Sequence, residues 1–170
     1  MKLIQGDCLE VMMTLPAQSV DAIITDLPYG TTACKWDSVI PFAPMWEAVK
    51  HVLKPKGAFV TTASQPFTSA LVMSNPALFR HEWVWEKSIG AHPLLCKVQP
   101  MKYHEHILVF GIGKVNYYPQ MTTGKRRDKR PIMSGVKDDE NWGGSMRNVS
   151  GIENITDRYY PRSVFYVSNA

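Results

Sequence analysis

Four consecutive residues, Asp26-Leu27-Pro28-Tyr29, combine a carboxylate, a proline ring and an aromatic side chain directly after an apolar run. The carboxylate of Asp26 and the backbone carbonyl of Leu27 can both accept hydrogen bonds from an amino group. Pro28 stiffens the loop, and Tyr29 can stack on the face of a planar ring. The tetrapeptide is therefore suited to bind a flat ring that carries an exocyclic amine. The same residue types are also ordinary in a turn that ends a strand.

The apolar run before the tetrapeptide, residues 20–25, predicts a β-strand. Because the run is almost continuously apolar, it is typical of a strand in the middle of a parallel sheet that is covered on both faces. Ligands of open α/β sheets bind outside the carboxyl ends of the strands. Residues 26–29 therefore stand where an active site is expected.

Strand-like and helix-like patterns alternate along the first 110 residues, which predicts an α/β fold. Helical spacing of apolar residues occurs at 9–15, 42–53 and 66–73, and strand patterns occur at 57–62, 82–86 and 106–110. The periodicity fades after Gly111, and residues 112–160 are rich in glycine, asparagine, serine, proline and charge. So long an irregular segment is usually functional, or is disordered until a partner binds. Residues 162–167 form a last strand-like run.

Length and composition favour one globular domain, because the chain has 170 residues of which 45% are hydrophobic. Its apolar stretches are too short to cross a bilayer, and its N-terminus lacks the apolar core of a signal peptide. The three cysteines, Cys8, Cys34 and Cys96, are an odd number and widely spaced. This pattern indicates neither a disulfide scaffold nor a zinc site, and a reducing cytoplasm is expected.

Positive charge is concentrated in the second half of the chain. Residues 1–85 carry a net charge of −1, whereas residues 86–170 carry +5. The excess peaks in one short run, which contains Lys125, Arg126, Arg127, Lys129 and Arg130. This run predicts contact with a polyanion, and the alternative is a solvated basic loop.

Further motifs accompany the tetrapeptide in a fixed order. They are Gly6-Asp7-Cys8-Leu9 upstream, the stretch 46–57 with its Leu-Lys-Pro-x-Gly turn, Trp83-Val84-Trp85-Glu86-Lys87, and the His-Glu strand at 104–110. In this order they resemble the amino-group DNA methyltransferases of the permuted (beta-type) arrangement. The resemblance covers residues 3 to about 113 and returns at 162–169.

The resemblance implies a fold and a division of the chain. The fold would be a partial Rossmann-like, S-adenosylmethionine-dependent methyltransferase fold of the α/β class. Residues 1–113 would form the catalytic region, and 114–161 a loop-rich target-recognition region. Residues 162–170 would form a return strand, and the cofactor-binding C-terminal part of the family would be absent.

The same resemblance assigns roles to residues. Asp26 and the Leu27 carbonyl would hold the target amine, with Pro28 between them and Tyr29 stacked on a base flipped out of double-stranded DNA. Asp7, Cys8 and Asp26 would meet S-adenosylmethionine, and the basic run would contact DNA phosphates. An initial Asp favours adenine N6 as the methylated atom, with cytosine N4 as the alternative. Leu27 departs from the proline that is common in the family, but it keeps the backbone carbonyl.

Two other patterns do not predict a site for a bound group. Residues 109–113 are glycine-rich but announce no helix, so they do not predict the family's cofactor loop. His104 and His106 share a strand face without a third ligand at a suitable spacing, so no metal site is predicted.

The missing family elements would leave the central strands of the sheet without neighbours and one sheet edge free, and several explanations stay open. The chain could be a shortened remnant of phage or prophage type. It could be part of a split enzyme or oligomer whose other part supplies the cofactor loop, or it could act only as a DNA-binding module. A nucleotide- or RNA-binding α/β protein without methyltransferase chemistry is the remaining alternative.

Overall fold

The computed structural model describes residues 1–91, 93–124 and 157–168. Internal contacts divide the chain into two units, Met1–Tyr117 with Arg162–Ala170, and Tyr118–Pro161. The described part of the second unit contains a two-stranded antiparallel sheet of β5 (Thr122–Thr123) and β6 (Arg158–Tyr159). The candidate site lies entirely in the first unit.

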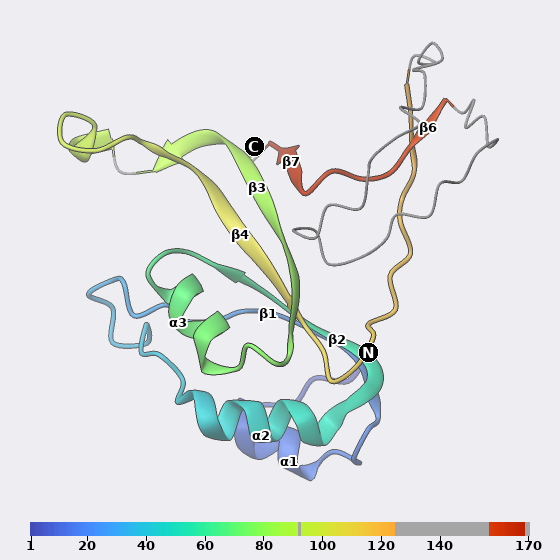
Figure 1. Ribbon diagram of the computed structural model, residues 1–170. Helices are drawn as coiled ribbons and strands as arrows, with labels where there is room; N and C mark the ends of the chain where they lie inside the picture. The colour runs from blue at the N-terminus through green and yellow to red at the C-terminus, as the bar shows by residue number, and fades with distance from the viewer. Residues whose placement is uncertain (92, 125–156, 169–170) are drawn as a thin grey trace, which may run out of the picture. The chain divides into compact units, whose positions relative to one another are not determined.

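A five-stranded sheet organises the first unit (Figure 1). Its strands are β1 (Val20–Asp26), β2 (Leu53–Ala63), β3 (Phe79–Ala91), β4 (Lys102–Phe110) and β7 (Val164–Val167). They lie in the order β1-β2-β4-β3-β7. The pairs β1–β2 and β3–β7 are parallel, whereas β4 is antiparallel to both of its neighbours. The α/β class is confirmed, with a mixed sheet.

The described residues also form three α-helices and one short 3-10 helix. They are α1 (Cys8–Thr14), α2 (Phe42–Val52), α3 (Phe67–Ser74) and η1 (Pro93–Leu95). The buried residues of α2 follow helical spacing and form one face, as amphipathic helices require; they are Met45, Trp46, Ala48, Val49 and Val52. No helix among the described residues is long and apolar enough to span a membrane.

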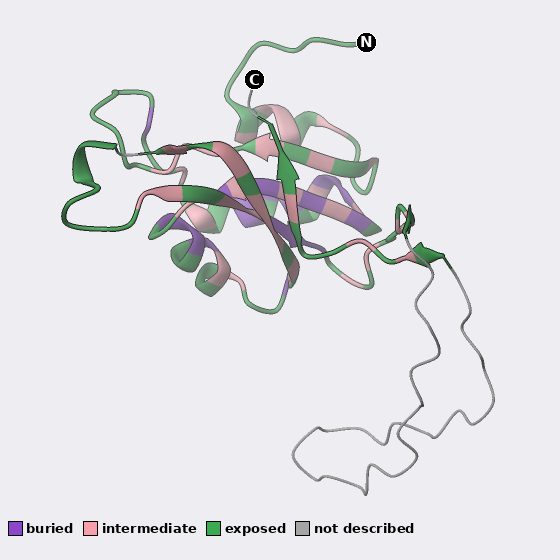
Figure 2. Cartoon of the chain, turned by 90° about the horizontal axis from the view of Figure 1, so that it is seen from above, coloured by how far each residue is buried: buried purple, intermediate pink, exposed green. Residues whose placement is uncertain are grey.

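The core lies between α2 and the central strands, where the buried residues concentrate (Figure 2). Phe110 of β4 is fully buried at its centre. Its ring centroid lies 5.0 Å from that of Trp46, 5.6 Å from that of Phe79 and 6.0 Å from that of Phe59. These tilted and edge-on contacts are favourable geometries for aromatic pairs, so this cluster stabilises the packing of α2 on the sheet.

The turn expected at residues 54–57 is an irregularity at the start of β2. Val20 of β1 is opposite Leu53, and Ala22 is opposite Ala58, so the residues between them bulge out of the pairing. A Cβ atom on Gly57 would lie 2.9 Å from the Asp21 carbonyl oxygen, so only glycine fits this close approach.

The prediction that residues 20–25 are buried in the middle of the sheet is wrong for the described structure. The strand is found as β1, but it lies at the edge of the sheet and pairs only with β2. Ile24 is 81% exposed as a result. The apolar composition indicated a strand correctly, but burial depends on which neighbours pair with it. Among the described strands, β1 has a neighbour on one side only.

Candidate active site

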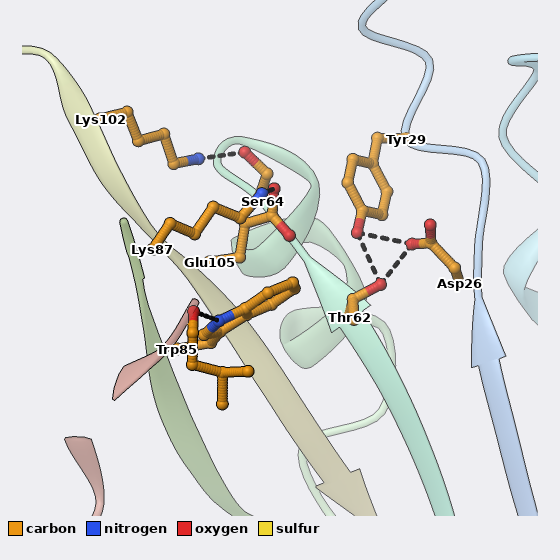
Figure 3. A network of polar contacts seen from close by, with 9 residues as sticks. Asp26, Tyr29, Thr62, Ser64, Trp85, Lys87, Lys102 and Glu105 are labelled. Carbon is orange, nitrogen blue, oxygen red and sulfur yellow. Dashed lines mark hydrogen bonds and ion pairs between the residues drawn. The ribbon is translucent and has the colours of Figure 1, made fainter. Parts of the chain in front are cut away.

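Three side chains meet at the carboxyl end of β1. Asp26 is the last residue of β1, and Thr62 is its partner in the parallel pairing with β2. The Tyr29 hydroxyl lies 2.8 Å from both Asp26 Oδ1 and Thr62 Oγ1. Thr62 in turn donates a hydrogen bond to the same Oδ1, which closes a triangle (Figure 3). Sequence reasoning missed Thr62, because its place depends on strand register.

The ring of Tyr29 is held from one side. It stacks on Phe67 of α3 with a centroid distance of 5.2 Å and an interplanar angle of 27°. Phe67 is itself buried and lies 6.0 Å from Phe42 of α2. One face of the tyrosine ring is therefore occupied by protein.

Tyr29 stays protonated in this environment. Burial raises the pKa of the Tyr29 phenol above its ordinary value, the Thr62 hydrogen bond opposes this, and the Asp26 carboxylate adds to it. A protonated phenol is a hydrogen-bond donor, so Tyr29 donates towards Asp26 rather than competing with it for hydrogens.

The remaining members of the tetrapeptide lie between these two residues. Leu27 packs partly buried against the hydrophobic core. The described loops and turns make no hydrogen bond to its carbonyl oxygen, which is available as a second acceptor beside Asp26. Leucine at this position thus adds an apolar anchor to the loop.

The loop that follows Tyr29 is fixed by Asp37, a buried residue that the sequence did not single out. Its carboxylate accepts hydrogen bonds from the backbone amides of Gly30 at 2.8 Å, Thr31 at 2.9 Å and Thr32 at 2.7 Å. Gly30 has φ +68°, a left-handed conformation that favours glycine. Asp37 therefore sets the backbone course directly after Tyr29.

Asp37 gives the folded chain a predicted acid sensitivity. The Thr32 side chain, followed by the backbone amides, lowers the pKa of Asp37 to about 2 from an ordinary value of 3.8. A depressed folded-state pKa stabilises the fold above the unfolded-state pKa, and that stabilisation is lost as pH falls from about 4 to about 2. Asp37→Asn should therefore unfold more easily than wild type at neutral pH, with the difference shrinking across this window.

Urea unfolding midpoints measured through that pH range test this expectation. Glu47→Gln, on the exposed face of α2, is the control for removing a carboxylate. A difference between Asp37→Asn and wild type that is constant with pH would contradict the assigned hydrogen bonds.

Charged residues of β3 and β4 lie beside the triangle (Figure 3). Lys87 forms an ion pair with Glu105, with side chains 20% and 25% exposed, and its ammonium lies 4.9 Å from the Trp85 ring centroid. Lys102 contacts the Ser64 hydroxyl just beyond the end of β2. Within the described residues Lys87 is matched by a carboxylate, and Lys102 has only a neutral partner.

The residues predicted to meet a cofactor are placed but not brought together. Asp7 caps α1, where its Oδ1 accepts a hydrogen bond from the Leu9 amide at 2.8 Å. Cys8 is the first residue of that helix and is exposed. No hydrogen bond joins either of them to Asp26 in the described part of the chain, so their cofactor role stays a prediction.

Two further sequence features are the basic run and the histidine pair of β4. The basic run at 125–130 lies outside the described residues. His104 and His106 have ring centroids 5.5 Å apart, and burial lowers the pKa of His106. The described residues contain no group of three or more metal-ligating side chains.

Comparison with known proteins addresses the fold. No protein-family model and no curated protein matches the sequence. Among solved structures, the cytosine-N4-specific PvuII DNA methyltransferase aligns over 97% of this chain with a TM-score of 0.56 and 14% identity. This chain shares the fold of that solved enzyme over the aligned residues. The expected fold class is thereby confirmed.

Two further solved structures resemble the chain more weakly. They are the complex of M1.HpyAVI with SAM (TM-score 0.49, 17% identity, 75% of this chain) and TTHA0409 from Thermus thermophilus complexed with S-adenosyl-L-methionine (TM-score 0.48, 17% identity, 68% of this chain). The chain spans only part of these proteins: 56% of the PvuII enzyme, 60% of M1.HpyAVI and 56% of TTHA0409.

Proposed function

We propose that this chain forms the target-base site of an S-adenosylmethionine-dependent DNA methyltransferase that methylates an exocyclic amine, adenine N6 in the first instance. The observation that carries the proposal is the position of Asp26-Leu27-Pro28-Tyr29 at the carboxyl end of β1 in a methyltransferase fold. Its side-chain and backbone acceptors and its aromatic ring are groups that suit an amino-bearing base.

The proposed mechanism relies on positioning and electrostatics. The amine lone pair is conjugated into the base and is therefore weakly nucleophilic. Asp26 Oδ2 and the Leu27 carbonyl accept its two hydrogens, which favours a tetrahedral nitrogen that can form the new N–C bond. The nitrogen then returns to neutrality by releasing one hydrogen as a proton along the hydrogen bond to Oδ2. Tyr29 stacks on the flipped base and, with Phe67 behind it, holds the ring plane.

The residues present fit S-adenosylmethionine in part. When bound, this cofactor would supply an electrophilic methyl group on a positively charged sulfur; the methyl–sulfur bond would break as the new N–C bond forms, and the sulfur would leave as a neutral thioether that keeps the bonding electron pair. Carboxylates favour a cation beside them. Asp26 Oδ2 receives no hydrogen bond from the described residues, and Asp7 uses only Oδ1 to cap α1. Asp7 Oδ2 would therefore be open to polar groups of the cofactor, whereas Asp26 Oδ2 would accept from the target amine and lie near the cofactor's positive charge.

A complete cofactor pocket needs further elements, and we propose that a second polypeptide or another copy of the chain supplies them. The free edge of β1 supports this, because a strand could pair there next to Asp26. The exposed side chain of Ile24 offers apolar surface to such an element. The basic run at 125–130 would contact DNA phosphates, independently of sequence.

Cytosine N4 is the second candidate target. It is supported by the cytosine-N4 specificity of the PvuII enzyme, whose fold this chain shares. Both targets present an amine on a planar ring to the same acceptors, so the geometry of Asp26 serves either. Mass spectrometry of digested DNA separates N6-methyladenine from N4-methylcytosine.

The decisive experiment combines binding and transfer. S-adenosylmethionine is titrated into the purified full chain by calorimetry, and transfer of a labelled methyl group to double-stranded DNA is measured. Binding and transfer are the expected results. Absence of both would refute a stand-alone enzyme, and retained salt-dependent DNA binding in that case would support the binding-module alternative.

A further inference from the structure

Thr62 links the two residues on which the proposed function depends. Its hydroxyl donates to Asp26 Oδ1 and lies 2.8 Å from the Tyr29 hydroxyl. The three residues come from β1, the loop after it and β2, and 36 positions separate Asp26 from Thr62. No motif in the sequence marks Thr62, and the methyl-transfer chemistry described above does not use it.

We propose that Thr62 is a positioning residue that holds Asp26 in one orientation, so that Oδ1 is occupied by protein donors and Oδ2 is presented to the target amine. This rests on the proposed function. It adds a distinction between the two carboxylate oxygens, one structural and one for the substrate.

The hydrogen-bond count within the triangle supports this division. Each hydroxyl has one hydrogen. With the Thr62 hydrogen donated to Asp26 Oδ1, the Tyr29 hydrogen is shared between that oxygen and Thr62 Oγ1. In the described part of the chain nothing donates to Oδ2. When hydrogen bonds hold one oxygen of a carboxylate, the direction of the other oxygen is fixed as well. An acceptor that stabilises a developing charge must be fixed in direction before the reaction.

Threonine is suited to this task at this position. Its branched Cβ restricts χ1, and β2 fixes its backbone opposite Asp26 in the parallel ladder. The Thr62 hydroxyl is therefore held in place before substrate binds, and little conformational entropy is lost on binding. The neighbouring Thr61 is 1% exposed and donates instead to the Thr62 carbonyl oxygen at 3.0 Å. Alternation along the strand turns its side chain to the opposite face of the sheet.

The test compares three variants of the full chain in methyl transfer. Thr62→Val keeps the shape and removes the hydroxyl, and we expect kcat to fall about 10- to 100-fold while KM for DNA changes little, as for the loss of one charge-assisted hydrogen bond. Thr62→Ser restores the hydroxyl and should recover most of kcat. Thr61→Val is the matched control, with kcat close to that of wild type.

A second measurement does not need activity. Three-bond NMR couplings of the Asp26 side chain report its χ1 angle. A single rotamer is expected in wild type and in Thr62→Ser, and averaged couplings in Thr62→Val. Averaging in wild type, or an unchanged single rotamer in Thr62→Val, would overturn the positioning role.

The two measurements separate the two proposals. If wild type transfers no methyl group yet the couplings change as expected, the proposed function fails and the positioning of Asp26 by Thr62 stands. If transfer is normal in Thr62→Val, the positioning role fails and the proposed function stands. Equal losses of kcat in Thr62→Val and Thr61→Val would indicate a general structural effect and would also refute the specific role.

Discussion

Replacing Asp26 by alanine is expected to lower kcat for methyl transfer by about 100- to 1,000-fold, the usual loss when one preorganised group that stabilises a transition state is removed. The reason is that Asp26 Oδ2 would accept a hydrogen of the target amine while the nitrogen becomes tetrahedral. The affinity for DNA should change far less, because phosphate contacts dominate such binding. Single-turnover methyl transfer together with a DNA-binding titration measures both quantities.

Asp21→Ala is the matched control for this substitution. Asp21 lies in the same strand β1, but it is exposed and pairs with Lys54 at 2.8 Å. A surface ion pair contributes little, so this variant should retain nearly full turnover. Unchanged turnover of Asp26→Ala in an active preparation would remove Asp26 from the catalytic role.

The second large effect is expected in the core. Phe110→Ala should lower the free energy of unfolding by about 3–5 kcal/mol, because a buried aromatic ring is lost and its cavity is not refilled. The ring has no exposed surface and contacts three other aromatic rings. A shift of the urea midpoint at unchanged slope would show a loss of stability rather than of cooperativity.

Met73→Ala controls for the loss of a large apolar side chain. Met73 lies on α3 and is 72% exposed, so its truncation should change the free energy of unfolding by less than about 0.5 kcal/mol. Similar losses in Phe110→Ala and Met73→Ala would contradict the assignment of the core to the cluster around Phe110.

The tertiary structure links the two residues that are central to the proposed reaction, Asp26 and Tyr29. Asp26 is not an isolated carboxylate at a strand end but one corner of a hydrogen-bonded triangle. Tyr29 is both the expected stacking platform and a donor to that carboxylate. The proposed base-binding ring and the proposed amine acceptor are therefore joined by hydrogen bonds, and a substitution at one is expected to affect the other.

The sequence by itself determined the local features of this protein. Apolar spacing located α2, because the amphipathic face of a helix repeats every 3.6 residues. The apolar run at 20–25 located β1 and so placed Asp26 at a strand end. The order of short motifs also indicated the methyltransferase fold. Each single motif or periodic pattern is made of residues close together in the chain, and this is why the sequence was enough to detect it.

Only the tertiary structure decided what lies around those features. The β1–β2 register places Thr62 opposite Asp26, and a one-residue slip would turn its hydroxyl to the other face. Asp37 folds back on the amides after Tyr29, and β1 lies at the edge of the described sheet. These outcomes depend on pairing between distant segments and on competition among possible neighbours. Contacts between distant segments produce no periodic pattern in the sequence, so they could not be predicted from it.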